Sequence, residues 1–291
     1  MAVSMSMQRR AALWFAAVAL APPTLAQQRR SLADPLRLGV DIALHQSSLA
    51  GALQRAFGRD TGIAVKLVPG SSASLLAALE RGELDATLSN SPDAEKRLES
   101  TGLAHDRTAV ASSEFVLVGP LLAPPQAKAP KAGKSTSQAK PRDPAGLLGA
   151  PGGAVAAMRR LAEAAAQTDS LRFISADDGS GTHMAEIALW RAAKIAPAPP
   201  WYQRVGGAGE LIAQARRHGS YALVERGAWA DHGGPPLAVL VQGDAALRVP
   251  VHFMRSFRSN HGAANLFSKW IAGPKGRAVI AAQRGYGAPG R

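Results

Sequence analysis

The chain has 291 residues, of which 46% are hydrophobic and 19% charged, a globular composition with room for about two domains. It contains no cysteine, which excludes disulfides, thiolate catalysis, thiolate metal sites and a lipidated N-terminal cysteine. The net charge of +13 would suit an anionic partner, but only 5% of the residues are aromatic and they form no stripe with basic residues. We therefore expect no nucleic-acid partner.

The first 26 residues have the order of a signal peptide. Arg9 and Arg10 precede an uninterrupted apolar run over residues 11–21, and small residues then lead to a cleavage point after Ala26. The apolar run has about half the length that spans a bilayer, and no later segment reaches that length. We therefore expect export to the periplasm, by either the general or the twin-arginine route.

The mature chain alternates strand and helix patterns, beginning with apolar residues at every second position over 36–40. An amphipathic helix follows, with Leu49, Leu53 and Phe57 on one face. Further strands are predicted at 63–67, 84–88 and 115–118, and a short helix is predicted at 75–79. Repeated strand–helix units predict an α/β fold with a mostly parallel sheet that is covered by helices on both faces.

Residues 121–150 interrupt this alternation. The stretch is rich in proline and lysine and contains a Ser-Thr-Ser cluster, so we expect a disordered basic insertion there. The alternation resumes after it. Helices are predicted at 155–166, 182–193, 210–217, 261–272 and 275–284, strands at 171–175, 221–224 and 237–241, and an extended segment at 247–251.

The segment 178–183, Asp-Gly-Ser-Gly-Thr-His, follows a predicted strand and begins a predicted helix. Free backbone N–H groups at a helix N-terminus favour an anion, and the two glycines would let the backbone approach a ligand closely. Ser180 and Thr182 add hydroxyl donors. The alternative is a plain capping turn, in which Ser180 or Asp178 caps the helix and binds nothing.

Two more polar turns, at 41–48 and 70–74, also join a predicted strand to a predicted helix. Ligands of open α/β sheets bind outside the carboxyl ends of the strands, so three turns of one kind predict a shared cleft. The candidate ligand-binding residues are Asp41, His45, Ser47, Ser48, Ser71, Ser72, Asp178, Ser180, Gly181 and Thr182.

Enzyme and metal chemistry are weighed on the same turn. Its Gly-Ser-Gly lacks the spacing of a nucleophile elbow, and we expect no catalytic residue. His183 and Glu186 are three residues apart and could bind a metal together with His45. A first-turn histidine with a structural hydrogen bond is the simpler interpretation of His183, so we expect neither a metal nor a cofactor.

Several short motifs occur in a fixed order along the chain. They are Gly-Arg-Asp-Thr-Gly at 58–62, Phe-Val-Leu-Val-Gly-Pro at 115–120, the 178–183 turn, Tyr-Ala-Leu-Val-Glu-Arg-Gly at 221–227 and Phe-Ser-Lys-Trp at 267–270. In this order and spacing the chain resembles the tungstate-binding periplasmic proteins of ABC transporters, within the type II solute-binding superfamily. The resemblance covers residues 38–286.

The resemblance implies two α/β lobes joined by two crossover strands, near 115–119 and 247–253, with a central cleft. Lobe I would hold 35–118 and 248–291, and lobe II would hold 119–247. It implies a small ligand, a tetrahedral oxyanion such as tungstate or molybdate, which is passed to an inner-membrane ABC permease. Ser71 and Ser72 would face the cleft from one lobe, and Ser180, Gly181 and Thr182 from the other. We expect a monomer.

The chain departs from this family at two ligand contacts. Asp41-Ile-Ala-Leu-His45 replaces a threonine- and serine-rich turn, and Ala176 replaces an arginine that meets the oxyanion. Charge-assisted arginine bonds are about twice as strong as neutral ones, so this replacement weakens the binding of a dianion. Either the cleft suits another small solute, neutral or amine-bearing, or Asp41 points away and serines and backbone N–H groups hold an oxyanion. A ligand-sensing domain is a further alternative.

Overall fold

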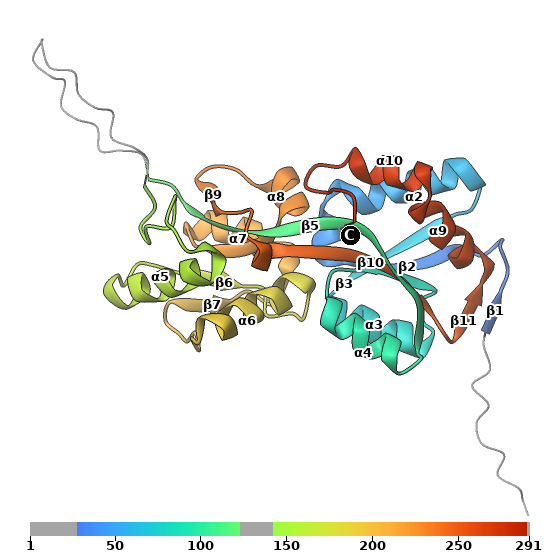
Figure 1. Ribbon diagram of the computed structural model, residues 1–291, viewed down its shortest axis with the longest axis horizontal. Helices are drawn as coiled ribbons and strands as arrows, with labels where there is room; N and C mark the ends of the chain where they lie inside the picture. The colour runs from blue at the N-terminus through green and yellow to red at the C-terminus, as the bar shows by residue number, and fades with distance from the viewer. Residues whose placement is uncertain (1–27, 123–141, 290–291) are drawn as a thin grey trace, which may run out of the picture.

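The computed structural model describes residues 28–122 and 142–289. The predicted signal peptide, 1–26, and most of the predicted insertion lie outside these residues. Figure 1 shows two groups of helices and strands side by side, which we call the first and second lobes, joined by the long strands β5 and β10 (Figure 1). The prediction of a two-lobed α/β fold is confirmed, whereas the exact lobe boundaries stay predictions.

The first lobe is built on three parallel strands, β2 (Leu36–Asp41), β3 (Val65–Gly70) and β4 (Ala86–Ser89), in the order β3-β2-β4. Apolar residues of β2 alternate, so Leu38 and Val40 pack into one core while Gly39 faces Leu84 on the opposite side. One core is formed with α2 (Ser48–Thr61), α9 (Gly262–Ala272) and α10 (Pro274–Ala281), and the other with α3 (Ser72–Arg81) and α4 (Pro92–Ser100).

The second lobe packs helices around short strands. Its elements are α5 (Gly153–Gln167), β6 (Phe173–Ser175), α6 (Gly181–Ala193), β7 (Tyr202–Arg204), α7 (Ala208–His218), β8 (Ala222–Glu225), α8 (Arg226–His232) and β9 (Leu237–Val241). Strands β6 and β7 pair in parallel. An aromatic cluster of Phe173, Trp190 and Tyr202 fills one side of this lobe.

Two long strands connect the lobes. β5 (Ala104–Pro120) pairs with β10 (Arg248–Ser256) over its first part and with β8 and β9 over its last part. The sheet therefore has seven strands, in the order β3-β2-β4-β10-β5-β8 with β9 also on β5. It is mixed rather than mostly parallel, because β10 returns to the first lobe antiparallel to both β4 and β5.

Several short elements were not predicted from the sequence, because each is too short to carry a periodic pattern or lies in a polar stretch. They are β1 (Gln28–Arg30), α1 (Ile42–Gln46), α4, β7, α8, the 3₁₀ turn Ala245–Leu247 and β11 (Ser259–His261), which pairs in parallel with β1. Within residues 28–122 and 142–289, no helix combines the length and apolar character needed to cross a membrane.

Residues 142–150 form ordered turns rather than part of a disordered insertion. Asp143 is buried, and its carboxylate accepts hydrogen bonds from the backbone N–H groups of Leu147 and Leu148 and from the hydroxyl of Tyr221. These bonds fasten the turn to the second lobe. The expectation of disorder is therefore wrong for this end of the stretch, and residues 123–141 lie outside the described residues.

Candidate functional site

Polar turns from both lobes meet at one place between them. The carboxyl ends of β2 and β3 lie at the same edge of the sheet, and they lead to Asp41 and to the start of α3. The turn after β6 leads into α6, which begins at Gly181 in the second lobe. The structure thus brings Asp41, the first residue of the predicted 41–48 turn, together with the 70–74 and 178–183 turns.

The Asp41 carboxylate lies at the centre of this meeting point and is fully buried. Its Oδ1 accepts a hydrogen bond of 3.1 Å from the N–H of Ala43 and so caps α1. Its Oδ2 accepts three bonds, from the N–H of Ser72 at 3.1 Å, the hydroxyl of Ser72 at 2.6 Å and the N–H of Gly181 at 3.0 Å. Asp41 therefore points into the cleft and not away from it.

The first residues of α3 and α6 also touch directly across the cleft. The N–H of Ala73 donates to the carbonyl oxygen of Gly179 at 3.1 Å. Gly179 has φ of +72°, a conformation that glycine adopts without strain. A Cβ atom added to Gly181 would lie 1.8 Å from Oδ1 of Asn90 in the first lobe. The turn therefore requires its second glycine for close approach of the lobes.

Ser180 and Asp178 have capping roles, which was the alternative prediction for this turn. The Ser180 hydroxyl oxygen caps α6 by accepting from the N–H of His183. The Asp178 carboxylate accepts from the N–H of Ser180 at 2.9 Å and from that of Ala208, the first residue of α7, at 2.7 Å. Thr182 is buried at the start of α6, and its hydroxyl has no hydrogen-bond partner among residues 28–122 and 142–289.

The remaining serine and histidine candidates have different surroundings. Ser71 caps α3 through the N–H of Ser74 and is only partly buried. Ser47 caps α2 and accepts a hydrogen bond of 2.8 Å from the hydroxyl of Tyr286. Ser48 is exposed, and its N–H donates to Asp231 of α8. Ser47 and Ser48 lie outside the cluster around Asp41, because the five residues of α1 separate them from Asp41. His45 lies on α1, and its buried Nδ1 has no hydrogen-bond partner among the residues that the structure describes.

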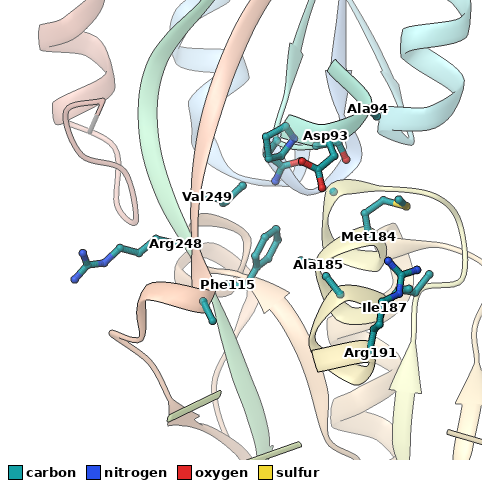
Figure 2. Close-up of a pocket in the computed structure, with 15 residues that line it drawn as sticks. Asp93, Ala94, Phe115, Met184, Ala185, Ile187, Arg191, Arg248 and Val249 are labelled. Carbon is teal, nitrogen blue, oxygen red and sulfur yellow. The ribbon is translucent and has the colours of Figure 1, made fainter. Parts of the chain in front are cut away.

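A cavity of about 200 Å³ lies beside this cluster, between the lobes. In Figure 2, Asp93 and Ala94 lie above the cavity, and Phe115 and Val249 on the left face Met184 and Ala185 of α6 on the right. The lining is mostly apolar. Two buried polar residues line it, Asn90 and Ser91, which follow β4. Among the described residues, neither the amide nitrogen and oxygen of Asn90 nor the hydroxyl of Ser91 has a hydrogen-bond partner. Asn90 was not predicted from the sequence, although Ser89-Asn90-Ser91 is a fourth polar turn after a strand.

The electrostatic setting of Asp41 is unusual for a buried carboxylate. Among the described residues, no arginine, lysine or histidine forms an ion pair with it. Burial raises the pKa of Asp41 above its usual value, although its hydrogen bonds from Ser72, Gly181 and Ala43 act in the opposite direction. Ala176 is fully buried and packs in an apolar cluster with Ile174 and Ala208.

His183 and Glu186, the two residues considered as metal ligands, make other contacts in the structure. Nδ1 of His183 accepts from the N–H of Gly179, which is the structural bond that the simpler interpretation predicted. Glu186 is buried elsewhere, where Tyr202 and Trp190 donate to its carboxylate. In the part of the chain that the structure describes, no three histidine, aspartate or glutamate side chains are grouped so as to hold a metal ion.

Two α/β lobes that meet over a cleft and are joined by two strands define the class of periplasmic solute-binding proteins. The model of the PBP superfamily domain matches residues 42–273, so the chain belongs to this family.

Relatives and solved structures agree with this assignment. The chain is 29% identical over 264 residues to the tungstate-binding protein TupA of Peptoclostridium acidaminophilum, which covers 87% of this chain and 83% of that protein. The structure of the tungstate ABC transporter protein of Geobacter sulfurreducens matches with a TM-score of 0.68 and 25% identity, covering 86% of this chain and 99% of that one. Tungstate-binding protein TupA of Desulfovibrio alaskensis matches with a TM-score of 0.65 and 26% identity, covering 89% and 100%.

Proposed function

We propose that this protein is an exported solute-binding protein that delivers a small ligand to an inner-membrane ABC permease and catalyses no reaction. Its family, its similarity to tungstate-binding relatives and the signal-peptide order of residues 1–26 support this function. On this proposal the protein acts as a monomer in the periplasm, and its cleft binds one solute molecule.

The proposed ligand is a tetrahedral oxyanion of the size of tungstate or molybdate. One observation carries this proposal: three donors from two lobes, the N–H and hydroxyl of Ser72 and the N–H of Gly181, converge on a single carboxyl oxygen, Oδ2 of Asp41. Both N–H groups belong to the first turns of α3 and α6, where the helix dipole favours an anion. The unpartnered hydroxyl of Thr182 and amide of Asn90 are two further donors beside this point.

A second candidate ligand is an amine-bearing or neutral solute. The observation that favours it is the buried Asp41 carboxylate, which has no basic ion-pair partner among residues 28–122 and 142–289. A protonated amine would supply the missing positive charge, whereas a dianion would meet charge repulsion.

Titration of the purified mature protein with tungstate, molybdate, phosphate and sulfate distinguishes these candidates. A ligand that binds only the folded state stabilises it by about 2.7 kcal/mol at a hundredfold excess over Kd. The melting temperature therefore rises. We expect such a shift with one of the four oxyanions and none with sodium chloride at the same ionic strength. If primary amines stabilise the protein and no oxyanion does, the second candidate replaces the first.

Ser72→Ala tests the donors directly, with Ser74→Ala as the matched control. Both serines lie in the first turn of α3, but only Ser72 is buried and bonded to Asp41. Because Asp41 uses the same hydroxyl, both variants are made in a protein that also carries Asp41→Ser, where we expect Ser72→Ala to weaken oxyanion binding by about tenfold, the loss of one charge-assisted hydrogen bond. Equal affinities of the two variants would remove α3 from the site.

A further inference from the structure

The Asp41 carboxylate has the contacts that the site offers to an anionic solute. A carboxylate is itself a small oxyanion, and Oδ2 already accepts three hydrogen bonds, at 2.6, 3.0 and 3.1 Å. A backbone N–H or a hydroxyl group has only one hydrogen to donate, so all three donors are occupied by Asp41. No second anionic oxygen can therefore use the same donors while Asp41 keeps this position.

Helix capping alone does not account for this arrangement. Capping of α1 uses only Oδ1, through the N–H of Ala43, and a serine or asparagine would serve as well. Oδ2 is engaged elsewhere, by Ser72 of its own lobe and by Gly181 of the other lobe. A buried carboxylate without a basic partner is unfavourable, so its bonds across the cleft are the interactions that offset its burial.

We propose that Asp41 is a tethered ligand: its carboxylate fills the anion position of the cleft, holds the two lobes together, and must leave before an oxyanion can bind. This proposal rests on the proposed function for the identity of the competing solute. Its geometric basis, one carboxylate oxygen shared by donors of both lobes, does not depend on that identity.

A second feature points to a larger anion that would displace Asp41. Asn90 is almost fully buried, adjoins Gly181 and lines the cavity, yet neither its amide nitrogen nor its amide oxygen has a hydrogen-bond partner in the part of the chain that the structure describes. Buried polar groups without a partner are rare. A tetrahedral oxyanion has four oxygens where a carboxylate has two. It could therefore bind the Asn90 amide in addition to the groups of Ser72 and Gly181 that now donate to Asp41.

Tethering sets the strength of the competition. A group attached to the chain acts at an effective concentration of the order of mM or more. The apparent affinity for a free solute is the intrinsic affinity multiplied by the fraction of molecules in which Asp41 has left the site. The protein would therefore respond only to high solute levels, and removal of the carboxylate would increase its affinity.

Asp41→Ser is the variant that tests the proposal, because serine still caps α1 but carries no negative charge. Asp143→Ser is the matched control, since Asp143 is also a buried carboxyl group and accepts three hydrogen bonds where Asp41 accepts four, but all within the second lobe. Isothermal titration with tungstate should show binding at least about tenfold tighter in Asp41→Ser than in the natural protein. Asp143→Ser should leave the affinity unchanged.

Two further measurements report on the tether without tungstate. Small-angle scattering should give a larger radius of gyration for Asp41→Ser than for the natural protein. Acetate, which restores a free carboxylate, should return the radius and the melting temperature of Asp41→Ser toward their natural values. If Asp41→Ser does not fold, Asp41→Asn serves in its place, because it keeps the size of the side chain and removes its charge.

The outcomes separate this proposal from the proposed function. If Asp41→Ser binds tungstate no more tightly and its radius is unchanged, Asp41 is a capping residue only and the tether is wrong. If neither protein binds any oxyanion but Asp41→Ser opens and acetate closes it, the tether stands and the oxyanion ligand is wrong.

Discussion

The backbone nitrogen of Gly181 lies 3.0 Å from Oδ2 of Asp41, although 140 residues separate them in the chain. This bond joins the N-terminus of α6 in the second lobe to the end of β2 in the first. It places a carboxyl group at the contact between the lobes, which is the geometric basis of the tether proposed above.

Gly181→Ala should separate the two lobes. The added Cβ would lie 1.8 Å from Oδ1 of Asn90, which is closer than nonbonded atoms approach. We expect the start of α6 to move away from Asn90, with a loss of about 1–3 kcal/mol in the free energy of unfolding and a larger radius of gyration. Urea unfolding and small-angle scattering measure the two effects.

Gly51→Ala is the control for this substitution. Gly51 lies inside α2, and the nearest atoms to an added Cβ belong to the flexible guanidinium of Arg55, at 3.1 Å. We expect an unchanged radius and stability that is unchanged or higher by up to about 1 kcal/mol, since alanine favours a helix. A stable and compact Gly181→Ala protein would show that the lobes do not need this close approach.

Glu95 holds the turn that carries Asn90, and its removal should be costly. Its buried carboxylate accepts from the N–H of Ser91 at 3.0 Å and lies 2.7 Å from Nδ1 of His252 and 3.2 Å from Nε of Arg107. Glu95→Ala leaves these partners without their acceptor, so we expect a loss of about 3–5 kcal/mol in urea unfolding.

Glu99→Ala provides the comparison on the same helix. Glu99 is 44% exposed, and its Oε2 lies as far as 4.0 Å from a guanidinium nitrogen of the same Arg107. Its removal should therefore change the free energy of unfolding by less than about 1 kcal/mol. A loss of stability as small in Glu95→Ala as in Glu99→Ala would mean that the contacts of Glu95 do not stabilise α4.

Ala176→Arg should destabilise the protein without increasing its affinity for oxyanions. The family resemblance suggests that an arginine there would meet the anion, but Ala176 is fully buried among Ile174, Ala208 and Ile212. A long charged side chain overfills this cluster, and we expect a loss of at least about 1–3 kcal/mol. Ala192→Arg, on the exposed face of α6, should change stability by no more than about 0.5 kcal/mol. Tighter tungstate binding by Ala176→Arg would show that the new side chain reaches the cleft.

The sequence was sufficient to predict the longer helices and strands, because their apolar patterns specify the faces that pack into the cores. The alternation of Leu36, Leu38 and Val40 predicts β2, and the one-faced pattern of 49–57 predicts α2, which ends at Gly62 with φ of +73°. The family motifs supplied the lobes' arrangement, since parallel and antiparallel pairings leave no separate mark on a short apolar run.

The centre of the site could be predicted only in part. Polar turns after strands pointed to Asp41, Ser72 and Gly181 separately, but no local pattern reports a contact across 140 residues. The five-residue helix α1 is too short for a periodic signal, and it moves Ser47 and Ser48 out of the site. Asn90 carried the same signal as the other polar turns and could have been found by it.

Folding stability should fall as the pH rises from about 4.5 to about 7, because two glutamates are buried in the folded state. Burial is the largest cause that raises the pKa of Glu186 to about 7 and that of Glu225 to about 7, from their usual 4.5. Between these pH values the folded protein binds more protons than the unfolded chain. Each group's contribution is therefore fully present below about pH 4.5 and is lost as the pH rises through 7.

Glu186→Gln should flatten this dependence, since glutamine stays neutral at every pH and can still accept from Tyr202 and Trp190. Urea unfolding at several pH values between 4.5 and 7.5 measures the slope, which is about 1.4 kcal/mol per pH unit for each proton. Glu163→Gln, on the exposed face of α5, should leave the slope unchanged. A slope that is the same in Glu186→Gln and the natural protein would mean that Glu186 is already ionised in the folded state at pH 4.5, in spite of its burial.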